Sequence, residues 1–147
     1  MLKLRSADSQ DLDEVCALLE RNGLPTSDLA HSRPEFVVAH DGAELIGAGA
    51  LERFGTVALL RSLVVAADRR GTGLGRRIVR ELERRASASG VRELVLLTQS
   101  AAPFFQQHGY RVVERGEVGA AVRASEEFRS LCPASSICMV KALSERQ

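Results

Sequence analysis

The sequence predicts an α/β protein with a mixed sheet of about seven strands and helices on both faces. Two observations carry this prediction. Segments with alternating or continuous apolar residues, which favour strands, alternate with segments whose apolar residues recur every three or four positions, which favour helices. No repeat or linker divides the 147 residues, a length that buries a core without a disulfide or a metal. We therefore expect a single domain over residues 1–147.

The first third of the chain predicts a strand, two helices and a hairpin. The alternating LKLR at residues 2–5 predicts the strand. Residues 6–25 show helical periodicity, and Gly23 and Pro25 at the end of this range terminate the helix. Residues 26–32 predict a second, short helix. Residues 35–55 hold two apolar runs around an Asp-Gly pair, which is typical of a β-hairpin.

The remainder alternates between strands and helices. The nearly continuous apolar run TVALLRSLVVAA predicts a central strand, and a helix with an arginine-rich outer face follows it up to Ser89-Gly90. Further along we expect a strand, a short helix with Pro103 in its first turn, and two final strands separated by a helix-prone piece. These segments are residues 91–98, 101–109, 110–118, 122–131 and 135–143.

The composition argues against several classes of binding partner. Lys plus Arg is 20 and Asp plus Glu is 19, so charge gives no argument for nucleic acid or a membrane, and 4% aromatic residues without Trp disfavour base stacking. No apolar run approaches the ~20 residues of a membrane span, and the N-terminus is too polar for a secretory signal. Three cysteines in such a chain suggest a reducing cytoplasm. No metal-ligand spacing is present, so we expect no metal.

One loop predicts a phosphate-bearing ligand. In VVAADRRGTGLGRRI, Val64 to Ile78, a strand is followed by arginines, three alternating glycines and a helix. A P-loop requires Lys-Ser/Thr where Arg76-Arg77 stands, and a dinucleotide fingerprint requires Gly-x-Gly-x-x-Gly and an acid after the next strand. The remaining pattern, Arg/Gln-x-x-Gly-x-Gly/Ala between a strand and a helix, is matched from Arg70 to Gly75.

On this loop and on nearly its whole order of elements, the chain resembles the GNAT superfamily of N-acetyltransferases. The resemblance implies the GNAT acyl-CoA N-acyltransferase fold, with acetyl-CoA as cosubstrate. It implies that the pyrophosphate is surrounded by Arg70, Gly71, Thr72, Gly73, Leu74, Gly75 and Arg76. It also implies that the pantetheine arm pairs with the backbone of Leu63, Val64 and Val65, and that the thioester lies near Ser100, Ala101 and Phe104.

The catalytic residues depart from the family pattern. The resemblance implies a Tyr as general acid in the helix after the fifth strand, but Phe105 stands there, and Tyr110 takes the place of a structural aromatic. The usual carboxylate in the core strands is also missing. Glu52, which ends the preceding strand, and Ser62 of the central strand are the candidate catalytic residues. The alternative for Glu52 is a solvated acid paired with Arg53 or Arg61.

Arg61, Phe128 and Leu131 are the candidate acceptor-binding residues. Arg61 interrupts an apolar strand, so it either grips an acidic group of the acceptor or pairs with Glu52. Phe128 and Leu131 belong to FRSLCP, a segment that we expect to line the acceptor pocket.

The C-terminal segment ASEEFRSLCPASSICMVKAL, together with GALERFG and LLRSLVV, is similar to a small GNAT subgroup associated with arsenic resistance. Cys132 and Cys138 therefore suggest the hypothesis that their thiols bind a trivalent arsenical. The simpler interpretation is that Cys138 is a buried small hydrophobe.

We expect an N-acetyltransferase that moves acetyl from acetyl-CoA to a primary amine of a small, amino acid-like or toxic molecule. Two alternatives stay open: acetylation of a protein N-terminus or lysine, and a non-catalytic domain that senses acyl-CoA. The missing Tyr and carboxylate keep the sensor open as an alternative. The resemblance also allows for a homodimer.

Overall fold

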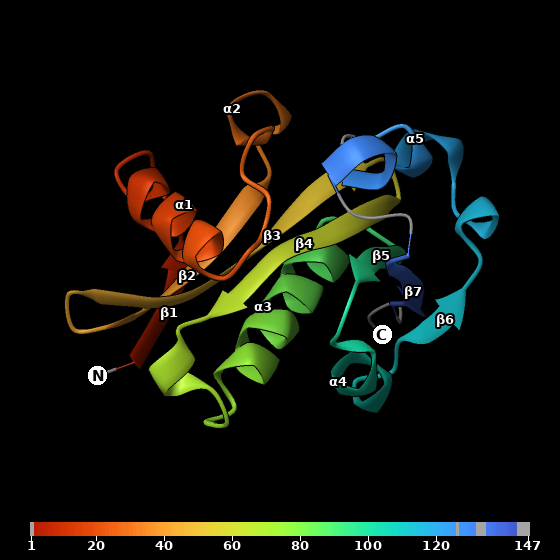
Figure 1. Cartoon of the computed structure of the whole chain (residues 1–147). Coiled ribbons are helices and arrows are strands. Elements are labelled where there is room, and N and C mark those ends of the chain that lie inside the picture. The colour runs from red at the N-terminus through yellow and green to blue at the C-terminus, as the bar shows by residue number, and fades with distance from the viewer. Residues whose placement is uncertain (1, 126, 132–134, 144–147) are drawn as a thin grey trace. The chain divides into compact units, whose positions relative to one another are not determined.

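The computed structural model describes residues 2–125, 127–131 and 135–143 (Figure 1). The strands are β1 (Leu2–Ser6), β2 (Glu35–Asp41), β3 (Glu44–Phe54), β4 (Val57–Val65), β5 (Glu93–Thr98), β6 (Arg111–Val113) and β7 (Ile137–Ala142). The α-helices are α1 (Leu12–Arg21), α2 (Leu29–Ser32), α3 (Leu74–Ala88), α4 (Ala102–Gln107) and α5 (Ala120–Arg123). Two 3-10 turns, η1 (Ala67–Arg69) and η2 (Arg115–Glu117), and a π-helical turn, η3 (Glu127–Leu131), complete the chain.

The strands form a seven-stranded sheet in the order β1-β2-β3-β4-β5-β7-β6. β4 and β5 are parallel, whereas β1-β2, β2-β3, β5-β7 and β6-β7 are antiparallel. The predicted fold class, a mixed sheet flanked by helices, is therefore confirmed. The chain divides into two compact units, of which the first is Met1–Glu52 with Leu60–Arg85 and the second Arg53–Leu59 with Ala86–Gln147.

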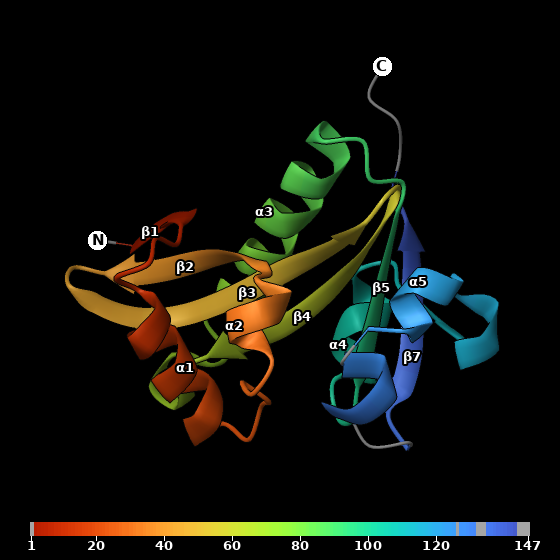
Figure 2. The ribbon, with the colours of Figure 1, turned by 90° about the horizontal axis from the view of Figure 1, so that it is seen from above.

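In the first unit, helices cover both faces of the sheet (Figures 1 and 2). On one face, Val15 and Leu19 of α1 and Leu29 of α2 pack in one core with Val38 and Ala48 of the sheet. On the other face, α3 lies against the glycines of β3. A Cβ placed on Gly49 would lie 2.9 Å from side-chain atoms of Ile78 and Leu82, so only glycine allows α3 this close.

In the second unit, Val57–Leu59 of β4 pair with Glu93–Val95 of β5, and β7 lies between β5 and β6. One face carries an apolar core, made by Leu59, Val95, Val118, Val122, Phe128, Cys138 and Val140. On the opposite face, Lys141 of β7 donates from Nζ to the carbonyl oxygen of His108, at the end of α4, at 2.8 Å.

The observed elements differ from the predicted ones near the C-terminus. The strand expected over residues 110–118 ends at Val113, because Glu114 and Glu117 form a capping box that starts η2. The helix-prone piece is split between α5 and η3. Among the described residues, no helix has both the length and the apolar character needed to cross a membrane.

Candidate active site

The glycine-rich loop between η1 and α3 presents its main chain. Gly71 and Gly73 have φ angles of +81° and +86°, a region that other residues adopt at a cost, and a Cβ on either would meet nothing within 4 Å. The main-chain N–H of Arg77 donates the first helical hydrogen bond of α3, to the carbonyl oxygen of Gly73 at 3.1 Å. The preceding N–H groups, of Leu74, Gly75 and Arg76, therefore have no acceptor inside the helix. Such a helix end favours an anion.

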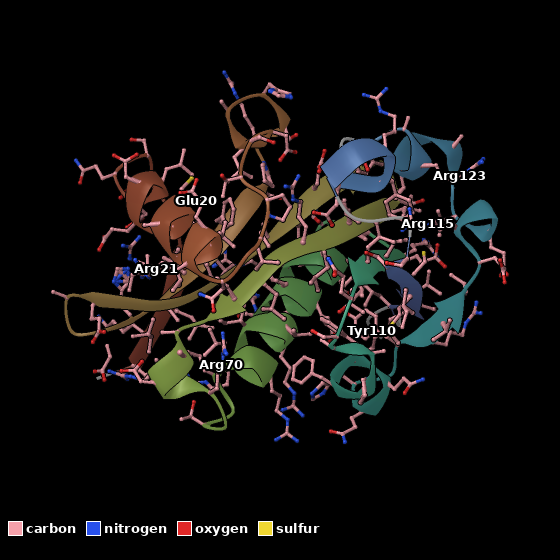
Figure 3. All side chains as sticks on the ribbon, viewed as in Figure 1. Glu20, Arg21, Arg70, Tyr110, Arg115 and Arg123 are labelled. Carbon is pink, nitrogen blue, oxygen red and sulfur yellow. The ribbon has the colours of Figure 1, made fainter. Side chains whose placement is uncertain are left out.

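Side chains hold this loop in place. Arg69 forms ion pairs with Asp41 at 2.8 Å and with Glu44 at 3.4 Å, on the β2–β3 hairpin. Arg70, labelled in Figure 3, donates to Asn22 at the end of α1. The Thr72 hydroxyl donates to the Arg69 carbonyl at 2.6 Å. The structure thus brings all seven predicted pyrophosphate residues, 70–76, into one loop and first helical turn of the first unit.

β4 pairs with β5 through its first three residues. Its ladder with β5 comprises Val57–Leu59, and the strand then continues to Val65. Ser62 has a φ of +58°, a left-handed conformation that is rare for a residue other than glycine. Such a bend redirects the main chain of a strand and is common at functional sites. It lies directly before Leu63–Val65, the predicted pantetheine segment.

A buried ion-pair network surrounds Arg61. Its Nη1 and Nη2 donate to the Asp28 carboxylate at 2.6 and 2.8 Å, and Nη1 also donates to Glu52 Oε1 at 3.1 Å. Its Nε donates to Ser62 Oγ at 3.3 Å. The side chains of Arg61 and Asp28 are fully buried, and that of Glu52 is 14% exposed. Three predicted site residues, Glu52, Arg61 and Ser62, are therefore in direct contact.

Asp28 is the functional candidate that sequence reasoning missed. Burial raises the pKa of its carboxyl, but hydrogen bonds from Arg61 and Ser32 outweigh burial, so the net shift is downward and the carboxylate stays charged. Of the two expectations for Arg61, pairing with Glu52 is the one that the contacts show. An arginine in an apolar strand signals a missing partner, yet Asp28 lies 33 residues away and no local pattern identifies it.

In the second unit, the predicted thioester segment leads into an aromatic cluster. Ser100 is exposed just before α4, and the ring of Phe104 lies 5.1 Å from that of Phe105 and 4.6 Å from that of His108. Phe105 and Tyr110 are buried, with ring centroids 5.4 Å apart. Both side chains serve the packing of α4, which agrees with a structural role for Tyr110 (labelled in Figure 3).

Of the remaining candidates, Phe128 and Cys138 belong to the apolar core of the second unit. Phe128 is buried there, with the guanidinium of Arg115 5.8 Å from its ring centroid. Leu131 is the last residue of η3, and Cys132 lies outside the described residues. Burial raises the pKa of the Cys138 thiol to about 11, as for an inert small hydrophobe. Within the described ranges, no group of three or more His, Cys, Asp or Glu side chains is placed to hold a metal ion.

Comparisons with known proteins bear on the family of this chain. The family model of the acetyltransferase (GNAT) domain matches residues 32–112. An uncharacterized N-acetyltransferase of Bacillus subtilis, YjcF, is 32% identical over 91 residues, which are 61% of this chain and 65% of that protein. Another, CT2212 of Chlorobaculum tepidum, is 37% identical over 89 residues, or 59% of this chain and 56% of its own. The chain thus spans less than two thirds of the length of these relatives.

The fold has a solved counterpart. The N-acetylglutamate synthase from Neisseria gonorrhoeae, complexed with coenzyme A and N-acetyl-glutamate, matches with a TM-score of 0.84 and 21% identity, covering 99% of this chain and 36% of that one. The comparisons give no support to the arsenic-resistance subgroup. Because the family model covers more than half of the chain, the chain belongs to the GNAT acetyltransferase family.

Proposed function

We propose that this protein transfers the acetyl group of acetyl-CoA to a primary amine of a small molecule. The observation that carries the proposal is the loop at 70–76, where two left-handed glycines and a helix N-terminus present main-chain N–H groups. The N-acetylglutamate synthase, complexed with coenzyme A and an acetylated amino acid, lends support. Because that product is small, a small acceptor is preferred over a protein N-terminus or lysine.

The cofactor would be held by both main chain and side chains. The N–H groups of the loop and of Leu74 to Arg76 would bind the pyrophosphate, and Arg70 and Arg76 would add positive charge. The backbone of Leu63–Val65 continues β4 beyond its ladder with β5, so it would pair with the amides of the pantetheine arm. Ser100 and Phe104 are proposed to lie near the thioester.

Acetyl transfer forms a bond between the amine nitrogen and the thioester carbon and breaks the carbon–sulfur bond, so that a proton leaves the nitrogen and the thiolate departs. Glu52 is the proposed acceptor of the proton, directly or through a water. Ser62 is the second proposed catalytic residue. Its left-handed backbone changes the direction of β4, and with it the direction of the main-chain N–H and C=O groups of the strand. Phe105 is buried and has no proton to give, so the coenzyme A thiolate would leave without a dedicated acid.

The test is thiol release from acetyl-CoA across a library of small amines, combined with calorimetry of coenzyme A binding. We expect binding, and turnover with at least one amine. Absence of coenzyme A binding would refute the proposal. Binding without turnover on every amine would favour an acyl-CoA sensor, the second candidate, which Phe105 in place of the family's Tyr supports. A cytoplasmic location and a homodimer belong to this proposal as expectations from the sequence.

A further inference from the structure

We propose that Asp28 is a positioning residue that sets the charge preference for the acceptor. By neutralising Arg61, it leaves Glu52 as the charged group available to the acceptor, so that the site selects amines without a neighbouring carboxylate over amino acids. This inference rests on the proposed function and names the substrate class of the same site.

The protein's own carboxylates occupy Arg61. Asp28 takes both terminal nitrogens of the guanidinium in a fork, at 2.6 and 2.8 Å, and both side chains are fully buried. Planar two-point pairs of this kind are the strongest protein ion pairs. An acceptor carboxylate that approached Arg61 would have to displace Asp28 and leave it charged, buried and unpaired, which is strongly unfavourable.

This pairing leaves negative charge at the site. Two carboxylates share one guanidinium in the contacts given above, so Asp28, Glu52 and Arg61 together carry an excess of negative charge. Among the three side chains, only that of Glu52 reaches solvent. Its Oε1 accepts from Arg61, and its Oε2 makes no hydrogen bond with the described residues. An ammonium group is attracted to this oxygen, whereas a carboxylate close to the amine is repelled.

Asp28 acts through Arg61 and does not itself touch the acceptor. It precedes α2, and the hydroxyl of Ser32 donates to its Oδ2. The guanidinium that it holds also reaches Glu52 Oε1 and Ser62 Oγ. Loss of the Asp28 charge would release Arg61 toward Glu52 or toward an acceptor carboxylate. Either movement changes which acceptors are preferred.

The experiment compares acceptors that differ only in the carboxylate: tyramine with tyrosine, histamine with histidine, and cadaverine with lysine. For each pair that turns over, we expect the wild type to show a higher kcat/KM for the amine. In Asp28→Asn, the ratio of the two values should fall by about tenfold, equivalent to about 1.4 kcal/mol. The matched control is Asp11→Asn, because Asp11 forms a similar two-point pair with Arg5, at 2.8 and 2.8 Å, elsewhere in the first unit.

Glu52→Gln provides a second, independent variant, since it keeps the Asp28–Arg61 pair. It should also lower the ratio, through a higher KM for the amine. Thermal unfolding and coenzyme A affinity are measured for every variant. If Asp28→Asn does not fold, the ratio in Glu52→Gln decides.

Two results would overturn the inference while the proposed function stands: a wild type that prefers the amino acids, or variants that lower both kcat/KM values by the same factor. Thiol release with none of the amines of the library or of these pairs would instead refute the proposed function, and the inference with it.

Discussion

The substitution Gly73→Ala tests the loop most directly, because the structure separates its effect on stability from its effect on binding. The φ of +86° costs alanine about 1–2 kcal/mol relative to glycine. A Cβ there meets nothing within 4 Å, so no clash adds to this cost. For a chain of 147 residues, the midpoint of thermal unfolding should fall by about 3–8 °C.

Binding should suffer in addition. If the pyrophosphate lies against the main chain of this loop, the new methyl group keeps it from at least one N–H. A hydrogen bond to a charged group contributes about 1.5–3 kcal/mol, so coenzyme A affinity should fall by about 10- to 150-fold. Calorimetry of coenzyme A with the purified protein measures this loss.

Gly55→Ala is the matched control for the loop variant. Gly55 also has a positive φ, +71°, and open space around a Cβ, but it lies in the β3–β4 turn. It should lose a similar amount of stability and keep the wild-type affinity for coenzyme A. If Gly73→Ala binds coenzyme A as well as Gly55→Ala does, the loop does not hold the pyrophosphate.

Four further predictions follow from buried groups. Arg61→Ala leaves Asp28 buried without its partner and should lower the free energy of unfolding by about 3–5 kcal/mol in urea titration, and a loss under 1 kcal/mol would contradict a desolvated pair. Because the pKa of Asp28 is lower in the folded state, its contribution to stability is present above an unfolded pKa of about 4 and fades as the pH falls further. The stability difference between wild type and Asp28→Asn should therefore shrink from pH 6 to pH 3, and a constant difference would argue against the pair. Gly49→Ala places a Cβ 2.9 Å from Ile78 and should cost about 1–3 kcal/mol by the same titration, so wild-type stability would mean that α3 can move away. The Cys138 thiol should resist a thiol reagent until urea unfolds the chain, since its pKa is raised to about 11, and rapid labelling of the native protein would show that it is accessible.

Most of the fold could be predicted from the sequence because its signals are local. The Asp-Gly pair placed the β2–β3 hairpin, and the apolar run of residues 56–67 identified β4 as a central strand. The position of β7 between β5 and β6 could not be predicted, because strand order depends on long-range pairing. The capping box of Glu114 and Glu117 was a local signal that was overlooked.

For the candidate site too, the parts that depend on consecutive residues could be predicted from the sequence, and the parts that depend on long-range contacts could not. The proposed diphosphate loop is encoded in consecutive residues, because main-chain N–H groups would do the binding and the glycines only permit the conformation. In the proposed site, acceptor recognition would depend on side chains that the fold brings together from distant parts of the sequence. Arg61 could be identified as a charge in need of a partner, whereas Asp28 and the left-handed Ser62 carry no sequence pattern that marks them.

Because the cofactor loop and the charged residues around Arg61 are separate parts of the proposed site, acceptor preference could change within such a domain while cofactor binding is kept. Under the proposed function, the loop at residues 70–76 holds the cofactor and does not contact the acceptor, so its requirements would stay the same whatever amine is acetylated. The charge around Arg61 is set by Asp28, before α2, and by Glu52, near the end of β3, and neither residue belongs to the loop at residues 70–76. Replacing Asp28 by a neutral side chain would release Arg61 to a carboxylate on the acceptor, whereas replacing Glu52 would keep the Asp28–Arg61 pair and remove the exposed negative charge. The pair of residues at 28 and 52 should therefore predict acceptor charge better than overall similarity does.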